Sequence, residues 1–374
     1  MSGTKQKIIM GDGSIGQLPE ILRSLKTRKL MLVCGGSFDK LGVKDILDGS
    51  GVPYVRFGGF SPNPTYEQAV DGAEMYRAEG CDAILAIGGG SAMDVAKCIK
   101  IYSKTELDRS CMPTSLCDTG VPLVAIPTTA GTGSESTRYA VVYFGGEKMS
   151  VTHDSIVPDV AILDPTLLYT LPLYQKKCTL LDALCQAIEA WWSVSSDAES
   201  VAYAKEAIEL IMANIEGYLE SDANATASIM LGSNLAGRAI NITRTTAAHA
   251  MSYKLTSLYS LPHGHAVAIC LPKIWRYMCY SLANGGEECT DSRGASHILS
   301  VFSDIAEAMG CPDAETAIDK FEDMLESFEL GETVRRSERD IDELAGSVNA
   351  DRLGNNPVRL TGETLYTLYS QIVK

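Results

Sequence analysis

Two polar side chains stand one helical turn apart in the segment LLDALCQAIEAWW, residues 180–192. Asp182 and Gln186 are four residues apart, so on a helix they share one face, where two metal ligands or a base and its partner could stand. A neutral amide is an unusual partner, because it offers one carbonyl oxygen and two N–H donors. The spacing is compatible with a metal site, an altered metal site or an ordinary helix.

Three of the five histidines fall in one short segment of the second half of the chain. His249 and Tyr253 form another pair four residues apart, and His263 follows in LPHG at an expected helix start. A lone buried histidine is more often a core residue than a ligand, but the clustering of three histidines favours a role as ligands. Together with Asp182 and Gln186, the histidines make a four-ligand oxygen and nitrogen set geometrically available.

Glycine- and threonine-rich turns offer different chemistry in the first half. The triplet in AIGGGSAMDVAKCIK lies between a buried strand and a helix, where backbone N–H groups could face a phosphate. The alternative is a tight turn with an N-cap serine. A second turn, IPTTAGTGSE, has four small hydroxyls: Thr128, Thr129, Thr132 and Ser134. Two such loops on neighbouring strands favour a dinucleotide, although neither is the GxGxxG fingerprint of an ordinary Rossmann fold.

The elements that must hold these residues change character near residue 170. Before it, short β-branched runs alternate with helical patterns and predict strands at 29–36, 52–60, 81–91, 121–129 and 159–165. After it, amphipathic patterns predict long helices, including 196–218, 226–240 and 297–309. The charged segment 331–340 is expected to be a solvated loop and helix start. We therefore expect an α/β domain with a parallel sheet over residues 1–170 and an all-helical domain over 171–374.

Composition excludes several classes of protein. The 374 residues are 45% hydrophobic, which suits two packed globular domains, and no apolar run approaches the roughly 20 residues of a membrane span. The 11 cysteines are scattered singly, and the charged N-terminus is unlike a signal peptide, so we expect a cytoplasmic protein with reduced thiols. A net charge of −15 argues against nucleic acid or an anionic membrane as partners. It leaves room for a small anionic substrate.

Four ordered motifs resemble those of the iron-containing (group III) alcohol dehydrogenases, relatives of the dehydroquinate synthase fold. They are GGGSAMDVAK, PTTAGTGSE, DALCQAIEA and HAMSYKL followed by LPHGHAVAICLP, and the likeness continues to NNPVRLTGETLYTLY at 355–369. The resemblance implies an N-terminal dinucleotide-binding α/β domain, a helical metal domain and an active site in the cleft between them. It also implies that the cofactors are NAD(P)H and a divalent metal, Fe²⁺ or Zn²⁺.

The same resemblance assigns roles to individual residues. The metal ligands would be Asp182, Gln186, His249 and His263. The cofactor-binding residues would be Gly35, Gly89, Gly90, Ser91, Asp94, Thr128, Thr129, Thr132, Ser134 and Lys148, the last near the ribose.

This chain departs from the family pattern at two positions. The family usually has histidine where Gln186 stands, and a second, proton-handling histidine where Tyr253 stands. We expect the metal to be retained at a weaker site, because a glutamine carbonyl can still bind a divalent ion. The alternative is a metal-free member. Tyr253, whose ordinary pKa is about 10, is expected to be the catalytic proton donor, the alternative being a packed aromatic residue that orients His249.

The substrate is expected to be a small aldehyde with an anionic tail. Arg244 and Lys254 lie close in sequence to the histidines and could neutralise such a tail, although both could be surface residues. Within the family, DALCQAIEAWWS and TTAAHAMSYKLTSLYSLPHGHA resemble most the branch that reduces phosphonoacetaldehyde to 2-hydroxyethylphosphonate. The alternatives are an alcohol dehydrogenase for other short aldehydes, a non-redox sugar-phosphate cyclase and a binding protein.

The preferred nicotinamide and the oligomeric state stay open. Relatives that prefer NAD tend to have an aspartate directly after the first strand, whereas this strand runs into Gly35 and reaches Asp39 only later. Acceptance of NADPH is therefore expected. A homodimer is the common case among oligomers, but nothing in the sequence identifies an interface.

Overall fold

The computed structural model describes residues 6–105, 108–331, 337 and 339–373. The chain divides into two compact units, one of residues 1–172 with 220–230 and one of residues 173–219 with 231–374. Most of the charged segment at 331–340 lies outside the described residues, and a helix begins at Asp340.

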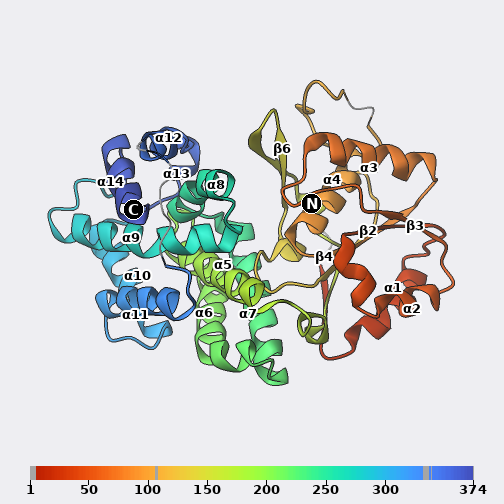
Figure 1. Ribbon diagram of the computed structural model, residues 1–374, viewed down its shortest axis with the longest axis horizontal. Coiled ribbons are helices and arrows are strands. Elements are labelled where there is room, and N and C mark those ends of the chain that lie inside the picture. The colour runs from red at the N-terminus through yellow and green to blue at the C-terminus, as the bar shows by residue number, and fades with distance from the viewer. Residues whose placement is uncertain (1–5, 106–107, 332–336, 338, 374) are drawn as a thin grey trace. The chain divides into compact units, whose positions relative to one another are not determined.

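In the described residues, the first unit contains a six-stranded parallel sheet in the order β1-β8-β5-β4-β2-β3 (Figure 1). Its strands are β1 (Lys7–Met10), β2 (Leu30–Cys34), β3 (Tyr54–Phe57), β4 (Ala83–Gly88), β5 (Leu123–Pro127) and β8 (Val160–Leu163). The helices of this unit are α1 (Leu18–Ser24), α2 (Val43–Asp48), α3 (Tyr66–Ala78) and α4 (Gly90–Tyr102). The predicted α/β domain with a parallel sheet is confirmed.

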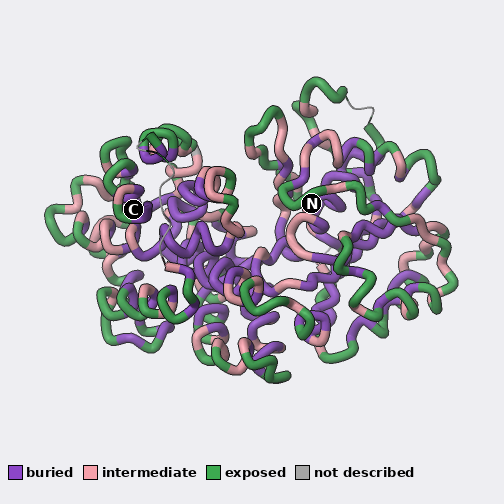
Figure 2. The backbone as a smooth tube through the Cα atoms, in the orientation of Figure 1, coloured by how far each residue is buried: buried purple, intermediate pink, exposed green. Residues whose placement is uncertain are grey.

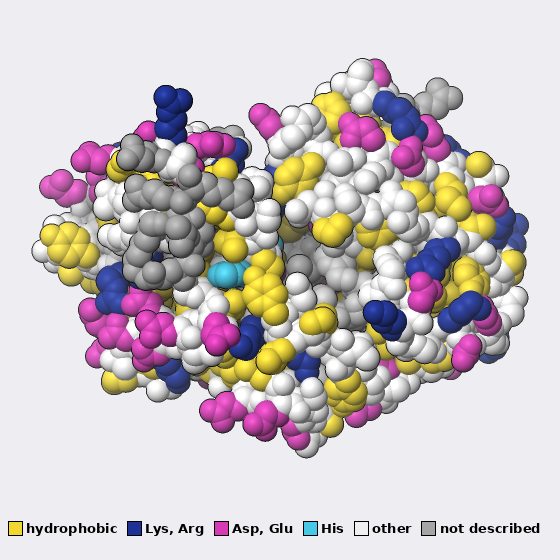
Figure 3. All heavy atoms as spheres, viewed as in Figure 1, with side chains coloured by type: hydrophobic (Ala, Val, Ile, Leu, Met, Phe, Trp, Pro, Cys, Tyr) yellow, Lys and Arg dark blue, Asp and Glu magenta, His cyan; other side chains and the backbone are white. Residues whose placement is uncertain are grey.

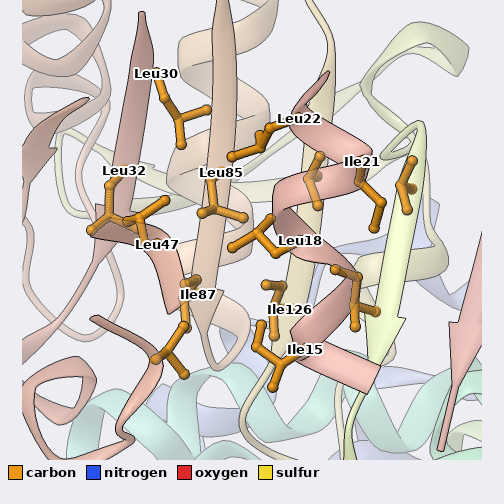
Figure 4. Packing of buried hydrophobic residues seen from close by; sticks show 14 of the residues in the cluster. Ile15, Leu18, Ile21, Leu22, Leu30, Leu32, Leu47, Leu85, Ile87 and Ile126 are labelled. Carbon is orange, nitrogen blue, oxygen red and sulfur yellow. The ribbon is translucent and has the colours of Figure 1, made fainter. Parts of the chain in front are cut away.

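The central strands are buried on both faces, which is why they read as continuous apolar runs rather than alternating ones. Along β2, Leu30 and Leu32 pack with α1 and α2, whereas Met31 and Val33 pack with α3 and α4. Figure 4 shows the first of these layers, with Leu18 of α1 against the sheet. Figure 2 shows that the residues at the centre of this unit are buried and that the surrounding helices have exposed residues.

Three strands of the first unit were not predicted. β1 is an edge strand with one buried residue, Ile9, so its hydrophobic signal is weak. β6 (Tyr139–Phe144) and β7 (Glu147–Thr152) form an antiparallel hairpin. Its turn residues, Gly145 and Gly146, have φ values of 60° and 83°, which glycine adopts without strain. The adjacent glycines are therefore a hairpin signal that the sequence analysis did not use.

The described residues of the second unit form helices and their connecting loops, with an isolated β-bridge between Cys289 and Val358. Its helices are α5 (Leu173–Trp192), α6 (Ala198–Leu219), α7 (Ala223–Thr243), α8 (Ala247–Tyr259), α9 (His263–Ala283), α10 (Ala295–Ala308), α11 (Ala314–Ser327), α12 (Asp340–Gly346), α13 (Ala350–Leu353) and α14 (Gly362–Ile372). The start of α7 belongs to the first unit. The helical C-terminal domain is confirmed, and no helix among the described residues is long and apolar enough to cross a membrane.

α5 is the central helix of this unit. It is buried without interruption from Leu180 to Trp192 and packs against α6, α9 and α10. The first turn of α9 comes closest to it, at Gly264. A Cβ atom built on Gly264 would lie 2.0 Å from the carbonyl oxygen of Cys178 and 2.9 Å from the Cβ of Asp182. Only glycine allows α9 to approach α5 this closely.

Replacing Gly264 with alanine should therefore destabilise the helical unit, by about 1–3 kcal/mol, because the added methyl group must displace backbone. Helix propensity alone would predict a stabilising effect of this substitution, since alanine is favoured over glycine in helices. Urea unfolding followed by tryptophan fluorescence reports on this unit selectively, because all three tryptophans lie on α5 and α9. Gly362→Ala, which adds a methyl group into open space on α14, is the matched control. Equal unfolding midpoints for the two variants would contradict the close approach.

Candidate active site

Helices α5, α8 and α9 bring three of the predicted metal ligands together. One ligand atom from each of Asp182, His249 and His263 lies within 4.8 Å of the others. The Nε2 atom of His249 is 3.3 Å from Oδ1 of Asp182, and both side chains are almost fully buried. Residues from two segments about 70 positions apart in sequence therefore form one compact cluster of oxygen and nitrogen donors.

Glu189 fixes the position of His249. It lies on the same face of α5 as Asp182, and its side chain is fully buried. Its Oε1 atom accepts hydrogen bonds from the Thr246 hydroxyl (2.7 Å) and from the backbone N–H groups of Thr246 (3.2 Å) and Ala248 (2.9 Å). These groups begin α8, so a carboxylate from another helix caps its N-terminus, where the helix dipole favours negative charge.

The second oxygen of Glu189 sets the orientation of the His249 ring. Oε2 binds Nδ1 of His249, and because an ionised carboxylate only accepts, Nδ1 must carry the hydrogen. Nε2 therefore faces Asp182, in the arrangement in which a carboxylate orients a metal-binding histidine. Burial alone lowers the pKa of His249, but the charge of Glu189 and the hydrogen bonds to Asp182 and Glu189 outweigh it and raise the pKa to about 9. The two carboxylates thus create a site that favours positive charge.

His263 occupies the first position of α9 and completes the cluster from another side. Its ring lies 5.3 Å from that of His249 in an edge-on arrangement and 5.9 Å from that of Tyr253, nearly parallel to it. The Ser252 hydroxyl donates to the carbonyl of His249 and lies 3.5 Å from Nδ1 of His263. Nδ1 therefore faces a hydroxyl that can accept its hydrogen, which leaves Nε2 of His263 as the ligand atom.

The donor set fits a divalent metal ion. The carbonyl oxygen of Gln186 is buried and accepts no hydrogen bond from any described residue, and the buried Nε2 atom of His249 faces only the carboxylate of Asp182 at 3.3 Å. A buried polar atom without a partner is costly, and a cation would satisfy the Gln186 oxygen while also binding Nε2 of His249 and the carboxylate of Asp182. Gln186 lies one turn after Asp182 on α5, so it can act as a fourth, neutral oxygen ligand beside the other three.

A neighbouring histidine shows the contrasting arrangement. His265 is buried, and its Nε2 atom lies 3.0 Å from the carbonyl oxygen of Leu330, to which it must donate. Its Nδ1 atom lies 3.1 Å from the hydroxyl of Tyr174, which can then donate to it. Both ring nitrogens are satisfied, so His265 has a structural role.

In the first unit, the two predicted phosphate loops leave adjacent parallel strands. β4 and β5 pair side by side, and Gly88 lies opposite Pro127 where they end. A Cβ atom on Gly90 would lie 3.0 Å from Cγ2 of Thr132, and one on Gly89 would lie 3.3 Å from the Thr129 side chain. The loops therefore touch through their glycines. α4 has no side-chain cap, and because Ala92 and Met93 donate to the carbonyl of Gly89, the backbone N–H groups of Gly90 and Ser91 remain for an anion.

Buried polar residues hold these loops in place. Asp94 accepts from the Ser134 hydroxyl at 2.8 Å and from the backbone N–H of Val141 at 3.1 Å. The fully buried Lys97 donates to Ser134 (2.9 Å), Thr137 (3.0 Å) and the Tyr139 carbonyl (2.7 Å), and burial lowers its pKa to about 8. Asp94 and Ser134, predicted to bind the cofactor, thus also shape the loop that would receive it.

The remaining predicted cofactor residues differ in accessibility. Ser91 and Thr132 are partly exposed, whereas Thr128 is buried. Burial raises the pKa of Asp94, and the charge of Lys148 is close enough to oppose that shift. The carbonyl oxygen of Gly35 accepts a hydrogen bond from Arg56 at 3.0 Å. Their contacts with a dinucleotide stay predictions.

The two cations predicted to bind the substrate have other surroundings. Lys254 forms an ion pair with Glu343 of α12 at 2.6 Å. Arg244 is exposed on the turn after α7, with a left-handed φ of 63°, and its side chain makes no ion pair or hydrogen bond within the described part of the chain. These contacts do not connect either residue to the metal cluster, so their role stays a prediction without structural support.

Two residues of the site were missed by the sequence analysis. Glu189 follows Asp182 by seven residues, so helical spacing alone could have placed it on the ligand-bearing face. Arg352 of α13 donates from Nη1 to the Tyr253 hydroxyl at 2.9 Å, and its guanidinium lies 4.9 Å from the centre of that ring. The two residues are 99 positions apart, and no local pattern links them.

A unit with paired phosphate loops and a helical unit with a metal-ligand cluster define a metal-dependent nucleotide-binding oxidoreductase. The family model of the iron-containing alcohol dehydrogenases matches residues 5–165, and that of the C-terminal region of the Fe-containing alcohol dehydrogenase family matches residues 177–373. The chain belongs to the iron-containing alcohol dehydrogenase family. It is an alcohol dehydrogenase or aldehyde reductase of this type, with NAD(P)H and a divalent metal as cofactors.

Similar proteins include reductases of small aldehydes. The chain is 32% identical over 315 residues to phosphonoacetaldehyde reductase of Streptomyces viridochromogenes, covering 80% of this chain and 78% of that protein. It is 34% identical over 317 residues to 1,3-propanediol dehydrogenase of Citrobacter freundii, with 80% and 76% covered. The structure of sulfoacetaldehyde reductase from Bifidobacterium kashiwanohense in complex with NAD⁺ superposes with a TM-score of 0.87 at 27% identity, covering 100% and 98% of the two chains.

Replacing Glu189 with glutamine should weaken metal binding about 10- to 100-fold, which is typical for loss of a group that orients a ligand. The glutamine amide can turn its N–H₂ group toward Nδ1 of His249, which moves the ring hydrogen to Nε2 and blocks the ligand atom. Competition of Zn²⁺ between the protein and a chromophoric chelator measures the affinity directly. Glu206→Gln, an exposed change on α6, is the control. Unchanged affinity in Glu189→Gln would mean that the carboxylate serves α8 alone.

Replacing Gly90 with valine should weaken binding of NADH, because the new side chain would push the two loops apart at Thr132. The effect should appear in the dissociation constant and in KM rather than in kcat, since contacts to the pyrophosphate persist from ground state to transition state. Titration of NADH fluorescence measures it without substrate. Gly16→Val, at an exposed glycine with open space around it, is the control. Equal NADH affinity in the two variants would refute the loop assignment.

Proposed function

We propose that the protein reduces phosphonoacetaldehyde to 2-hydroxyethylphosphonate with NAD(P)H. The observation that carries the proposal is the buried cluster of Asp182, His249 and His263 with Tyr253 stacked beside it. Two of the similar proteins named above reduce two-carbon aldehydes that carry an anionic group, which supports a substrate of this kind. The net charge of −15 does not oppose it, because acidic and basic side chains are interspersed on the face shown in Figure 3.

The side chains of the cluster define where a carbonyl group would react. A divalent ion held by Asp182, His249, His263 and Gln186 would supply the positive charge that polarises a carbonyl group, and the nicotinamide would supply the hydride. Glu189 keeps the imidazole of His249 in the orientation that leaves Nε2 as a ligand. The close approach of α9 at Gly264 keeps His263 next to Asp182.

We propose that Tyr253 supplies the proton that completes the reduction. Arg352 has only donors, so the tyrosine oxygen accepts from Arg352 and must donate its own hydrogen to another group. The ring of Tyr253 stacks on His263, a member of the cluster. Aldehyde, hydride and this proton together give the alcohol, and solvent then restores the proton to the half-buried tyrosine.

A second candidate is the reduction of uncharged short aldehydes. It is supported by the identity with 1,3-propanediol dehydrogenase, which at 34% is similar to that with phosphonoacetaldehyde reductase. We also propose that the enzyme works in the cytoplasm, because all 11 cysteines are free thiols. A role in phosphonate biosynthesis is proposed from the similarity to phosphonoacetaldehyde reductase.

A panel of phosphonoacetaldehyde, sulfoacetaldehyde and propionaldehyde, assayed with NADH and with NADPH, tests the proposal. The expected kcat/KM is highest for phosphonoacetaldehyde, by roughly 10- to 100-fold over propionaldehyde, since one charge-assisted contact contributes about 1.5–3 kcal/mol and ~1.4 kcal/mol is one decade. A chelator should abolish all activity, and Fe²⁺ or Zn²⁺ should restore it. Higher kcat/KM for propionaldehyde would favour the second candidate, and full activity without metal would contradict the metal site.

A further inference from the structure

Arg352 is a cation placed next to the reactive cluster. Its guanidinium lies over the ring of Tyr253, and the same ring stacks with His263, one of the three clustered ligands. The distances are 4.9 Å from the guanidinium carbon to the Tyr253 centroid and 5.9 Å between the Tyr253 and His263 centroids. Tyr253 therefore contacts both a fixed positive charge and a ligand of the cluster.

The guanidinium has donors to spare. Tyr253 takes one of its five N–H groups, and within the described ranges no carboxylate lies at ion-pair distance from Arg352. The residue is half-buried. A planar group with several parallel donors is the side chain best suited to bind a phosphonate or sulfonate through two oxygens.

Two other cations of the helical unit are already paired with carboxylates. The Lys254 ammonium is held by Glu343 at 2.6 Å, and Arg276 is shared among Glu315, Asp319 and Glu322. In contrast with these ion-paired groups, Arg352 combines a contact to Tyr253, partial burial and unused donors.

We infer that Arg352 determines the substrate specificity of the enzyme by binding the tetrahedral anionic group of a two-carbon aldehyde. This inference rests on the proposed function and deepens it, because it replaces the predicted pair Arg244 and Lys254 with one residue. An aldehyde with its anionic group on the neighbouring carbon is short, which suits a cation only 2.9 Å from the hydroxyl of the proposed proton donor. The same hydrogen bond to Tyr253 couples the anion-binding residue to the proton donor.

Selectivity measures this role separately from any effect on Tyr253. In Arg352→Met, the ratio of kcat/KM for phosphonoacetaldehyde to that for propionaldehyde should fall about 10- to 100-fold, which is the effect expected from the loss of one charge-assisted contact. In Tyr253→Phe, kcat should fall for both aldehydes while the ratio stays the same, because the lost group handles the proton common to both reactions. Arg359→Met, an exposed arginine near Glu288, is the matched control and should leave the ratio unchanged.

A binding measurement supports the kinetic one. Methylphosphonate should inhibit the wild-type enzyme competitively with phosphonoacetaldehyde, and its inhibition constant should rise in Arg352→Met by the same factor as the selectivity falls. If circular dichroism shows that Arg352→Met does not fold, Arg352→Lys provides the test. Lysine keeps the charge but loses the paired donors, so the ratio should fall by a smaller factor.

The outcomes separate this inference from the proposed function. A wild-type enzyme that prefers propionaldehyde to both anionic aldehydes would overturn the proposed function, and the inference with it. A wild-type enzyme that prefers the anionic aldehydes, with an unchanged ratio in the folded Arg352 variant, would overturn the inference alone. For each anionic aldehyde, the relevant ratio is its kcat/KM divided by that for propionaldehyde. A fall in this ratio for both phosphonoacetaldehyde and sulfoacetaldehyde in Arg352→Met would support one binding site for either anionic group.

Discussion

The candidate site depends on the buried carboxylate of Glu189. An unpaired charge at this depth would be strongly destabilising, and the start of α8 compensates it with a hydroxyl, backbone N–H groups and the imidazole of His249. One side chain of α5 therefore fixes the entry of the chain into α8 and the orientation of a ligand on it. Asp182 is two turns earlier on α5, so the carboxylate and imidazole ligands are positioned from one rigid helix.

The two departures from the family pattern have different consequences in this setting. Gln186 keeps a buried oxygen where an imidazole nitrogen is usual, so it removes a strong ligand while leaving the shape of the site intact. Tyr253 replaces a titrating ring with a hydroxyl whose oxygen is already engaged by Arg352. The first change affects how tightly a metal is held. The second brings a permanent cation beside the cluster, because an arginine stays charged at every physiological pH.

The sequence predicted what local periodicity encodes. The spacing of Asp182 and Gln186, the pair His249 and Tyr253, and the helix start at His263 all depend on neighbours within a few residues, as do the strands that end in glycine clusters. Contacts between distant segments produce no such local pattern in the sequence. The cap that Glu189 provides to α8 and the hydrogen bond from Arg352 to Tyr253 both depend on how helices pack. Lys254 was predicted to bind substrate from its proximity in sequence to the histidines, but in the structure it pairs with Glu343.

The central claim is that helices α5, α8 and α9 build one divalent metal site. Anomalous X-ray diffraction at the iron and zinc absorption edges, from crystals grown with each metal, locates the ion without reference to activity. The account predicts a single strong anomalous peak within bonding distance of Asp182, His249 and His263, with the Gln186 carbonyl oxygen directed at it. Crystals of the active enzyme with no peak there, or with the metal bound elsewhere in the chain, would contradict it.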